Sequence, residues 1–288
     1  MNSNDLKIFL AAAELGSFTK AADDTFTVQS NVTARIKSLE EEFGAELFKR
    51  SGRRVVLTDA GRTLISYARK IGHLIENAKD DIQKGDNVGG VLRIGCIETT
   101  MALKAPEIIK DFGLGYPEVE LEFHSSDVST LIKKVLDHKL DAAYVAAPIH
   151  TAGLKQLKIC DEELVIIASE KNETITEMLR SDDLKIIVFE EGCFFRSRLE
   201  AWLTFQGISQ YKLTIVNSIE GIVNFVEAGL GISIMPAEVI RRYYQNRRLQ
   251  TLSLNKELGT MTTLLVYRDD IDVKNSLKAY IGQSFTLS

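Results

Sequence analysis

Residues 29–43 read QSNVTARIKSLEEEF, and this stretch decides the fold of the N-terminal part of the chain. Its apolar residues recur every three or four positions and therefore share one helical face: Val32, Ile36, Leu39 and Phe43. Gly44 is expected to end this helix as a C-terminal cap. Upstream, the apolar spacing of residues 6–13 predicts one more helix, and Ser17 is a natural N-cap for another.

Two short strands are predicted to follow the third helix. They cover residues 47–50 and 53–57 and are joined by a turn at Ser51-Gly52, with basic residues on both sides of the tip. Residues 1–58 are therefore predicted to form three helices followed by a wing.

The charge of residues 1–58 is unevenly distributed, although eight bases balance eight acids. Six of the bases lie in the third helix or around the wing, whereas the acids gather at residues 23–24 and 40–42. The whole chain has a net charge of −5, so any nucleic-acid contact must be local. The basic side of this small domain could lie along DNA phosphates.

The third helix begins with polar residues of the kinds that contact base edges from a recognition helix. Gln and Asn suit adenine, Arg suits guanine, and arginines at the wing tip suit a narrow minor groove. The alternative is a solvated polar face on a small helical domain. The predicted DNA-contacting residues are Ser17, Thr19, Gln29, Ser30, Asn31, Thr33, Arg35, Lys37, Arg53 and Arg54.

A long helix is predicted from Thr58 or Asp59 through Lys84, followed by a flexible linker at residues 85–90. One stripe of this helix alternates by four and three residues, which favours pairing with a second copy of the helix. The alternative is that the stripe packs on its own domain. The predicted dimerisation residues are Leu64, Ala68, Ile71, Ile75, Ala78 and Ile82.

From Val91 onward, predicted strands alternate with predicted helices. The first strands fall at residues 91–95, 119–123 and 141–146, with helices at 105–112 and 130–138 between them. This order predicts an α/β fold with a parallel sheet. The pattern restarts at residue 164, with predicted strands at 164–168, 186–189, 213–216 and 232–236. Between them, one helix is predicted to end at Leu179 and two more to cover 196–205 and 219–228. Two similar halves predict a cleft suited to a small ligand.

Several ordered segments carry a family resemblance that spans nearly the whole chain. They are GSFTKAA (16–22), VQSNVT (28–33), IKSLE (36–40), GAELFKR (44–50), LTDAG (57–61), LRIG (92–95), YP (116–117), LDAA (140–143) and VEAGLGIS (226–233) before Pro236. The chain resembles the LysR-type transcriptional regulators. Thr25 departs from the family's usual Leu, which would loosen the second helix unless Phe26 compensates. Arg35 stands where the family often has Gln, so a base preference cannot be carried over there.

The resemblance implies three parts with distinct roles. Residues 1–58 would form a winged helix-turn-helix, residues 59–90 a linker helix and hinge that pairs two chains, and residues 91–288 a two-lobed effector domain like that of periplasmic binding proteins. The first lobe would comprise about 91–161 and 268–288, and the second about 162–267. The implied partners are an operator with an interrupted inverted repeat, a small-molecule effector, further copies in dimers or tetramers, and RNA polymerase.

The resemblance also places the effector where several loops converge between the lobes. Hydroxyls and amides at helix N-termini, with Arg196 as a clamp, favour an anion there. The alternatives are simple N-capping by Thr99, Thr100 and Ser218, and an ordinary exposed charge for Arg196. The predicted effector-binding residues are Thr99, Thr100, Ser125, Ser126, Asp127, Ala146, Cys193, Arg196, Asn217 and Ser218.

Other classes of function find less support in the residues. Cys193 precedes a predicted helix near a cation, an environment that can lower a thiol pKa, so a thiol-redox-responsive regulator is an alternative. The region around Gly229 and Gly231 lacks the third glycine of a dinucleotide loop, and phosphate-loop, Gly-x-Ser-x-Gly and metal signatures are absent, which disfavours an enzyme and a resident cofactor. The solute-binding-protein alternative leaves the winged N-terminus unexplained. A purely structural DNA binder would not respond to a ligand.

The composition of the chain indicates the cellular compartment in which the protein is expected. The longest apolar runs are too short to span a membrane, and the N-terminus lacks the basic leader of a signal peptide. Three widely spaced cysteines fit neither a disulfide framework nor a metal cluster. We therefore expect a cytoplasmic protein with reduced thiols and no membrane partner.

Overall fold

The computed structural model describes residues 1–51, 54–84, 88–171, 174–181, 183–269 and 273–284. The chain divides into two compact units, of which the first holds residues 1–87 and 137–139 and the second holds the remainder. Within the described ranges, no helix combines the length and hydropathy that crossing a bilayer requires.

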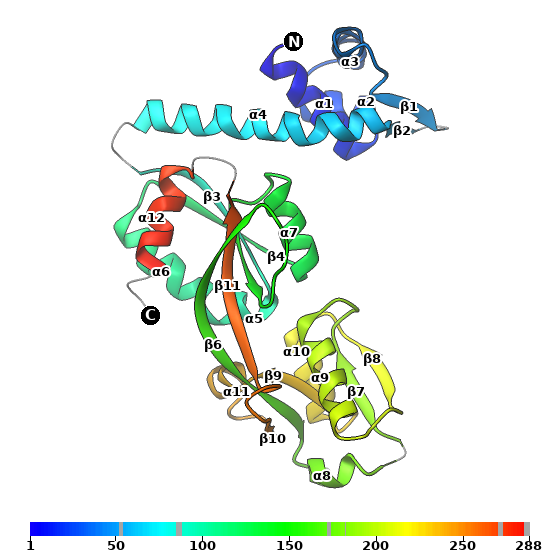
Figure 1. Ribbon diagram of the computed structural model, residues 1–288, viewed down its shortest axis with the longest axis vertical. Helices are drawn as coiled ribbons and strands as arrows, with labels where there is room; N and C mark the ends of the chain where they lie inside the picture. Colours follow the sequence, from blue (N-terminus) through cyan, green and yellow to red (C-terminus); the bar gives the residue numbers. More distant parts are fainter. Residues whose placement is uncertain (52–53, 85–87, 172–173, 182, 270–272, 285–288) are drawn as a thin grey trace. The chain divides into compact units, whose positions relative to one another are not determined.

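The N-terminal unit begins with three helices and a two-stranded antiparallel sheet (Figure 1). Its elements are α1 (Ser3–Leu15), α2 (Phe18–Asp24), α3 (Gln29–Phe43), β1 (Phe48–Ser51) and β2 (Arg54–Leu57). Ser17 caps α2 by accepting a hydrogen bond from the Lys20 backbone at 3.3 Å. Gly16 and Gly44 end α1 and α3 at φ angles of +59° and +63°, which glycine adopts without steric cost. The predicted three helices and wing are confirmed.

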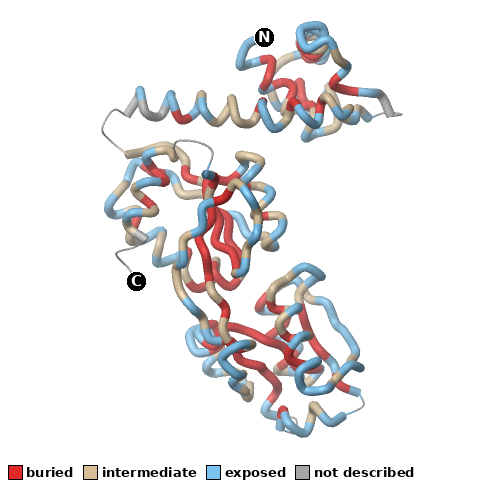
Figure 2. Tube along the Cα trace, viewed as in Figure 1, coloured by how far each residue is buried: buried red, intermediate tan, exposed pale blue. Residues whose placement is uncertain are grey.

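The core of this unit is a single apolar cluster shared by all its helices. Phe9, Ala12 and Val32 are fully enclosed in it. The long helix α4 (Asp59–Lys84) adds Leu64 and Ala68 to the same cluster. In Figure 2 the buried positions of this unit appear as red segments along its first helices, whereas most of α4 is tan or pale blue.

The second unit has two lobes, each a sheet between two layers of helices (Figure 1). In the first lobe the strands follow the order β6-β11-β5-β3-β4. Helices α6 and α12 cover one face of this sheet and α7 covers the other. Its elements are β3 (Gly90–Cys96), α5 (Glu98–Leu103), α6 (Ala105–Gly115), β4 (Val119–Ser125), α7 (Val128–Leu136), β5 (Ala142–Ala146), β6 (Leu154–Ser169), β11 (Thr260–Arg268) and α12 (Asn275–Ser284).

The second lobe is built around the far end of β6. There β6 pairs with β9 and β10, and a bridge between Ile186 and Ile232 connects β9 to the parallel pair β7-β8. Side chains on alternate residues of β6 face α9 on one side and α10 and α11 on the other. The elements are α8 (Ile175–Met178), β7 (Lys185–Val188), α9 (Phe194–Phe205), β8 (Lys212–Ile215), α10 (Ile219–Glu227), β9 (Ser233–Pro236), α11 (Ala237–Tyr243) and β10 (Leu249–Ser253).

The two-lobed α/β class is confirmed, but the predicted parallel sheet is instead a mixed one. Among the described residues, β3 pairs in parallel with β4 and β5, β7 pairs in parallel with β8, and Ile186 and Ile232 form a parallel bridge, whereas β6 and β11 cross between the lobes as long antiparallel partners. The predicted strand at 164–168 is only the end of the 16-residue β6. Since β11 pairs with β5 from Thr263 onward, the chain has re-entered the first lobe before residue 268.

Candidate DNA-binding face and effector cleft

The exposed face of α3 carries a polar stripe opposite its buried apolar face. Gln29, Thr33 and Lys37 are exposed and lie four residues apart, so they share one side of the helix. Thr19 Oγ1 donates to Gln29 Oε1 at 3.1 Å and thereby links the start of α2 to the start of α3. Ser30 is also exposed beside this stripe. These predicted DNA-contacting residues form one solvent-facing patch.

Asn31 and Arg35 are less exposed than that stripe, and each is held by another side chain. The Asn31 amide donates to Thr27 Oγ1 at 2.8 Å within the turn between α2 and α3. Arg35 Nη1 donates to Asp5 Oδ1 at 3.0 Å, and the Asp5 side chain is only 6% exposed. Asp5 also accepts from the Asn2 backbone at 2.8 Å in the capping box of α1. Arg35 thus joins α3 to the first turn of α1.

The turn before α3 presents apolar side chains that the sequence analysis did not identify as contacts. Phe26 is 97% exposed and has a φ angle of +52°, so it does not compensate for Thr25 inside the domain. Thr25 instead donates its hydroxyl to the Ala21 carbonyl at 2.6 Å. Val28 is 64% exposed at the N-cap position of α3. The helical periodicity of the sequence does not predict the positive φ angle of Phe26.

On the wing, Arg54 is exposed at the first position of β2. Arg53 lies outside the described residues, so its predicted contact stays a prediction.

The apolar stripe of α4 divides into two parts. Leu64 and Ala68 are buried in the domain's own core, and Ile71 and Ile75 line a narrow groove of about 30 Å³ beside α1. Ala78 is exposed and Ile82 is 83% exposed. The first two turns of the stripe therefore pack within the domain, and its C-terminal part presents apolar surface.

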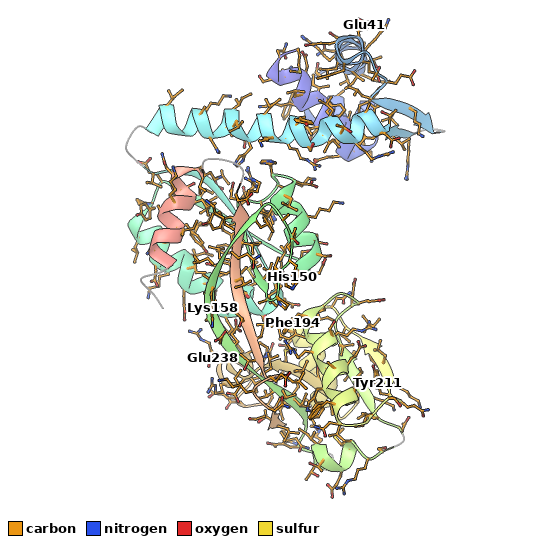
Figure 3. The ribbon with its side chains drawn as sticks, in the orientation of Figure 1. Glu41, His150, Lys158, Phe194, Tyr211 and Glu238 are labelled. Carbon is orange, nitrogen blue, oxygen red and sulfur yellow. The ribbon has the colours of Figure 1, made fainter. Side chains whose placement is uncertain are left out.

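A cavity of about 350 Å³ lies where loops of the two lobes meet. Five of the predicted effector residues line it: Ser125, Ser126, Asp127, Cys193 and Asn217. Apolar walls come from Ile97, Val128 and three phenylalanines, of which Phe194 is labelled at the boundary of the lobes in Figure 3. Three carboxylates outside the predicted set also line the cavity, namely Glu98, Glu190 and Glu191.

The other predicted effector residues do not line this cavity. Thr99 and Thr100 are buried in α5, and their hydroxyls have no hydrogen-bond partner among the described residues. Ala146 is buried in β5. Arg196 Nε pairs with Glu200 at 3.0 Å, and Ser218 caps α10 by accepting from the Gly221 backbone at 3.1 Å.

The chain's own carboxylates occupy the helix N-termini at the cavity. Asp127 accepts bonds from Ser129 Oγ at 2.6 Å and the Thr130 backbone at 2.9 Å at the start of α7. Burial alone would raise the pKa of Asp127, but these hydrogen bonds lower that pKa to about 2, so the group is ionised at neutral pH. Glu98, on α5 of the first lobe, accepts from the Ile219 backbone at 3.0 Å at the start of α10 in the second lobe.

The expected anionic effector is at odds with this lining. Every charged residue among the described cavity residues is acidic, and the Arg196 guanidinium is paired with Glu200. The helix N-termini that were expected to attract an anion already hold Asp127 and Glu98. An incoming carboxylate would therefore face like charges at short range.

The thiols of the cleft region do not resemble activated cysteines. Burial raises the pKa of Cys193 and outweighs the lowering by backbone hydrogen bonds from Phe195 and Arg196, while the carboxylates Glu98 and Asp127 raise that pKa by a lesser amount. Burial also raises the pKa of Cys96 to about 12. A reactive thiolate needs a lowered pKa, so the redox alternative is not favoured.

A helix-turn-helix with a wing, a long helix and a two-lobed domain around a cavity define a DNA-binding regulator with an effector-binding domain. Residues 3–62 match the bacterial regulatory helix-turn-helix protein family of the lysR type, and residues 85–283 match the LysR substrate binding domain. The chain belongs to the LysR family of transcriptional regulators, which are not enzymes.

Individual relatives agree with this assignment. The HTH-type transcriptional regulator YofA of Bacillus velezensis is 34% identical over 287 residues, covering 97% of this chain and 98% of YofA. A full-length OxyR variant from Pseudomonas aeruginosa has a TM-score of 0.74 at 20% identity, over 99% of this chain and 94% of OxyR. Full-length CbnR in complex with its target DNA has a TM-score of 0.71 at 18% identity, over all of both chains. The two solved structures share the fold of this chain.

Proposed function

We propose that the protein reads its operator with the exposed stripe of α3 in the major groove and with the wing beside it. The observation that carries this proposal is the presentation of Gln29, Thr33 and Lys37 on one solvent-facing side of α3. Gln29 is suited to adenine and Lys37 to a phosphate, while exposed Phe26 and Val28 suit thymine methyl groups. Arg54 of the wing would contact the adjacent backbone.

We infer that two chains pair through the C-terminal half of α4. Ile75, Ala78 and Ile82 supply the apolar surface for that contact, since Leu64 and Ala68 are already buried in their own domain. Two paired recognition helices require an interrupted inverted repeat whose half-sites are separated by whole turns of DNA, each about 34–36 Å. Pairs of dimers would form tetramers.

The effector would act through the cavity between the two lobes. A small molecule bound there would favour one arrangement of the assembly and change operator binding, DNA bending and the access of RNA polymerase in the cytoplasm. It can shift that equilibrium only by its differential affinity for the two arrangements.

The proposal is tested by footprinting the protein on DNA upstream of its own gene and of the neighbouring divergent gene. Thr33→Ala and Lys37→Ala should lose protection, and Lys155→Ala, an exposed lysine of the effector domain, is the matched control. Lys37→Ala should also reduce the slope of log affinity against log salt by about 1. Equal protection by all three variants would refute the assignment of α3 as the reading element.

A further inference from the structure

We propose that the cleft binds an organic cation, specifically an amine or guanidinium carried on a short apolar body. This inference rests on the proposed function, because it concerns the effector of the same cavity. It is carried by the charge of the lining, the aromatic walls and the size of the space.

The sign of the charge follows from the lining residues. Four carboxylates and no lysine, arginine or histidine line the cavity among the residues that the structure describes: Glu98, Asp127, Glu190 and Glu191. The starts of α5, α7, α9 and α10 meet there, and each helix N-terminus contributes at most roughly half a positive elementary charge. Four such termini offset at most about half of the four negative charges. The field inside the cavity therefore attracts cations.

The carboxylates keep unused acceptor capacity for a ligand. An ionised carboxylate can accept about four hydrogen bonds. Glu98 accepts one from the Ile219 backbone, and Glu190 accepts one from the Asn217 amide. Glu191 is exposed at the cavity rim and makes no hydrogen bond or ion pair with any described residue. An ammonium donates three hydrogen bonds and a guanidinium donates five, so both suit this excess of acceptors.

The aromatic walls favour the same class of ligand. Phe194 and Phe195 meet edge to face with ring centroids 5.8 Å apart, and Phe189 lies 6.3 Å from Phe195. Aromatic faces attract organic cations through the ring quadrupole. Phe194 already does so, because the Arg198 guanidinium carbon lies 4.9 Å from its ring centroid. Arg198 itself does not line the cavity.

A bare metal ion fits this arrangement less well than an organic cation. The described residues contain no group of three or more His, Cys, Asp and Glu side chains placed to hold a metal. The carboxylates are instead distributed over a space of about 350 Å³, which is the size of a small organic molecule. A cation that engages Glu98 would also act on a hydrogen bond that joins the two lobes.

The test is isothermal titration calorimetry, which measures the affinity of the full-length protein for pairs of compounds matched in shape and opposite in charge. Benzylamine is compared with benzoate, 1,4-diaminobutane with succinate, and agmatine and Mg²⁺ are titrated alone. At least one organic cation should bind at least tenfold more tightly than its matched anion. The Glu190→Gln, Glu191→Gln double variant should weaken that binding at least tenfold, and Glu191→Gln alone should weaken it in the same direction. Glu170→Gln, an exposed glutamate outside the cavity, should leave it unchanged.

Three outcomes would overturn the inference. They are tighter binding of benzoate or succinate, binding of Mg²⁺ without any amine, and binding of none of the organic cations by protein that still protects its operator. A footprint on the same sample separates these outcomes from failure of the proposed function, in which operator protection itself would be absent.

Discussion

The ion pair between Arg35 and Asp5 predicts that Arg35→Ala destabilises the DNA-binding domain. The guanidinium donates at 3.0 Å to a carboxylate that is 6% exposed. Breaking a fully buried pair costs about 3–5 kcal/mol because one charge is left without a partner. Arg35 is 41% exposed and Asp5 keeps its bond from the Asn2 backbone, so we expect about 1–2 kcal/mol here.

The assay is amide hydrogen exchange of α1 and α3 in the full-length protein, which reports the opening free energy of that domain alone. A double-mutant cycle with Asp5→Asn isolates the pair. In the Asp5→Asn background, Arg35→Ala should cost much less than in the wild type, because no unpaired carboxylate remains. The coupling energy between Arg35 and Asp5 should account for most of the opening free energy that Arg35→Ala loses on its own.

Operator binding by the same variants distinguishes this clamp from base reading. If Arg35 acts by holding α3 against α1, Arg35→Ala should weaken binding to all operator variants alike. If it instead contacts guanine, discrimination at one base pair should fall by about 1–3 kcal/mol with the protection of α1 and α3 intact. Unchanged exchange together with relaxed specificity would refute the reasoning.

Three further predictions follow from other parts of the structure. Lys274→Met should lower the free energy of unfolding by about 3 kcal/mol, because it removes the only charged partner of the buried Asp141 carboxylate among the described residues and the side-chain donor to the Val91 carbonyl, leaving Asp141 its bond from the Arg93 backbone; urea unfolding followed by circular dichroism measures this. Asp127→Ala should lower the free energy of unfolding by about 1 kcal/mol at neutral pH, because the N-cap of α7 is lost. The pKa of Asp127 is lowered to about 2 in the folded state, so the difference in urea midpoint between wild type and Asp127→Ala should be full above pH 4 and shrink as the pH falls towards 2. A difference that stays constant over this pH range would contradict the prediction. Ile82→Glu should shift sedimentation towards monomer, whereas the exposed control Tyr67→Glu should not.

The helical elements of the first unit were predictable because their signals are local. Caps at Ser17, Gly16 and Gly44 and the apolar spacing of α3 place the boundaries without reference to distant residues. The mixed sheet of the second unit was not predictable in the same way. Its long strands β6 and β11 pair residues about a hundred positions apart, and such pairing leaves no short-range period in the sequence.

The loops of the cleft show the same division between local and distant information. The family resemblance placed Ser125, Ser126 and Asp127 at the effector site, in the loop after a predicted strand, and they line the cavity. The charge of the cavity could not be anticipated from loop chemistry. It depends on Glu98 and Glu190 coming from separate segments, and on which partners those segments meet.

Two expectations weaken for one physical reason, which is that the chain satisfies its own polar groups. Asp5 holds Arg35, a predicted base reader, and Asp127 and Glu98 occupy helix N-termini that were expected to attract an anion. A buried polar group is stable only when paired, so internal partners must be counted before an external one is assigned. The stripe of α3 stays exposed although Gln29, Thr33 and Lys37 each have a partner within the domain, and the cavity carboxylates keep acceptor capacity. Operator choice and effector choice should therefore depend on these two sets of residues.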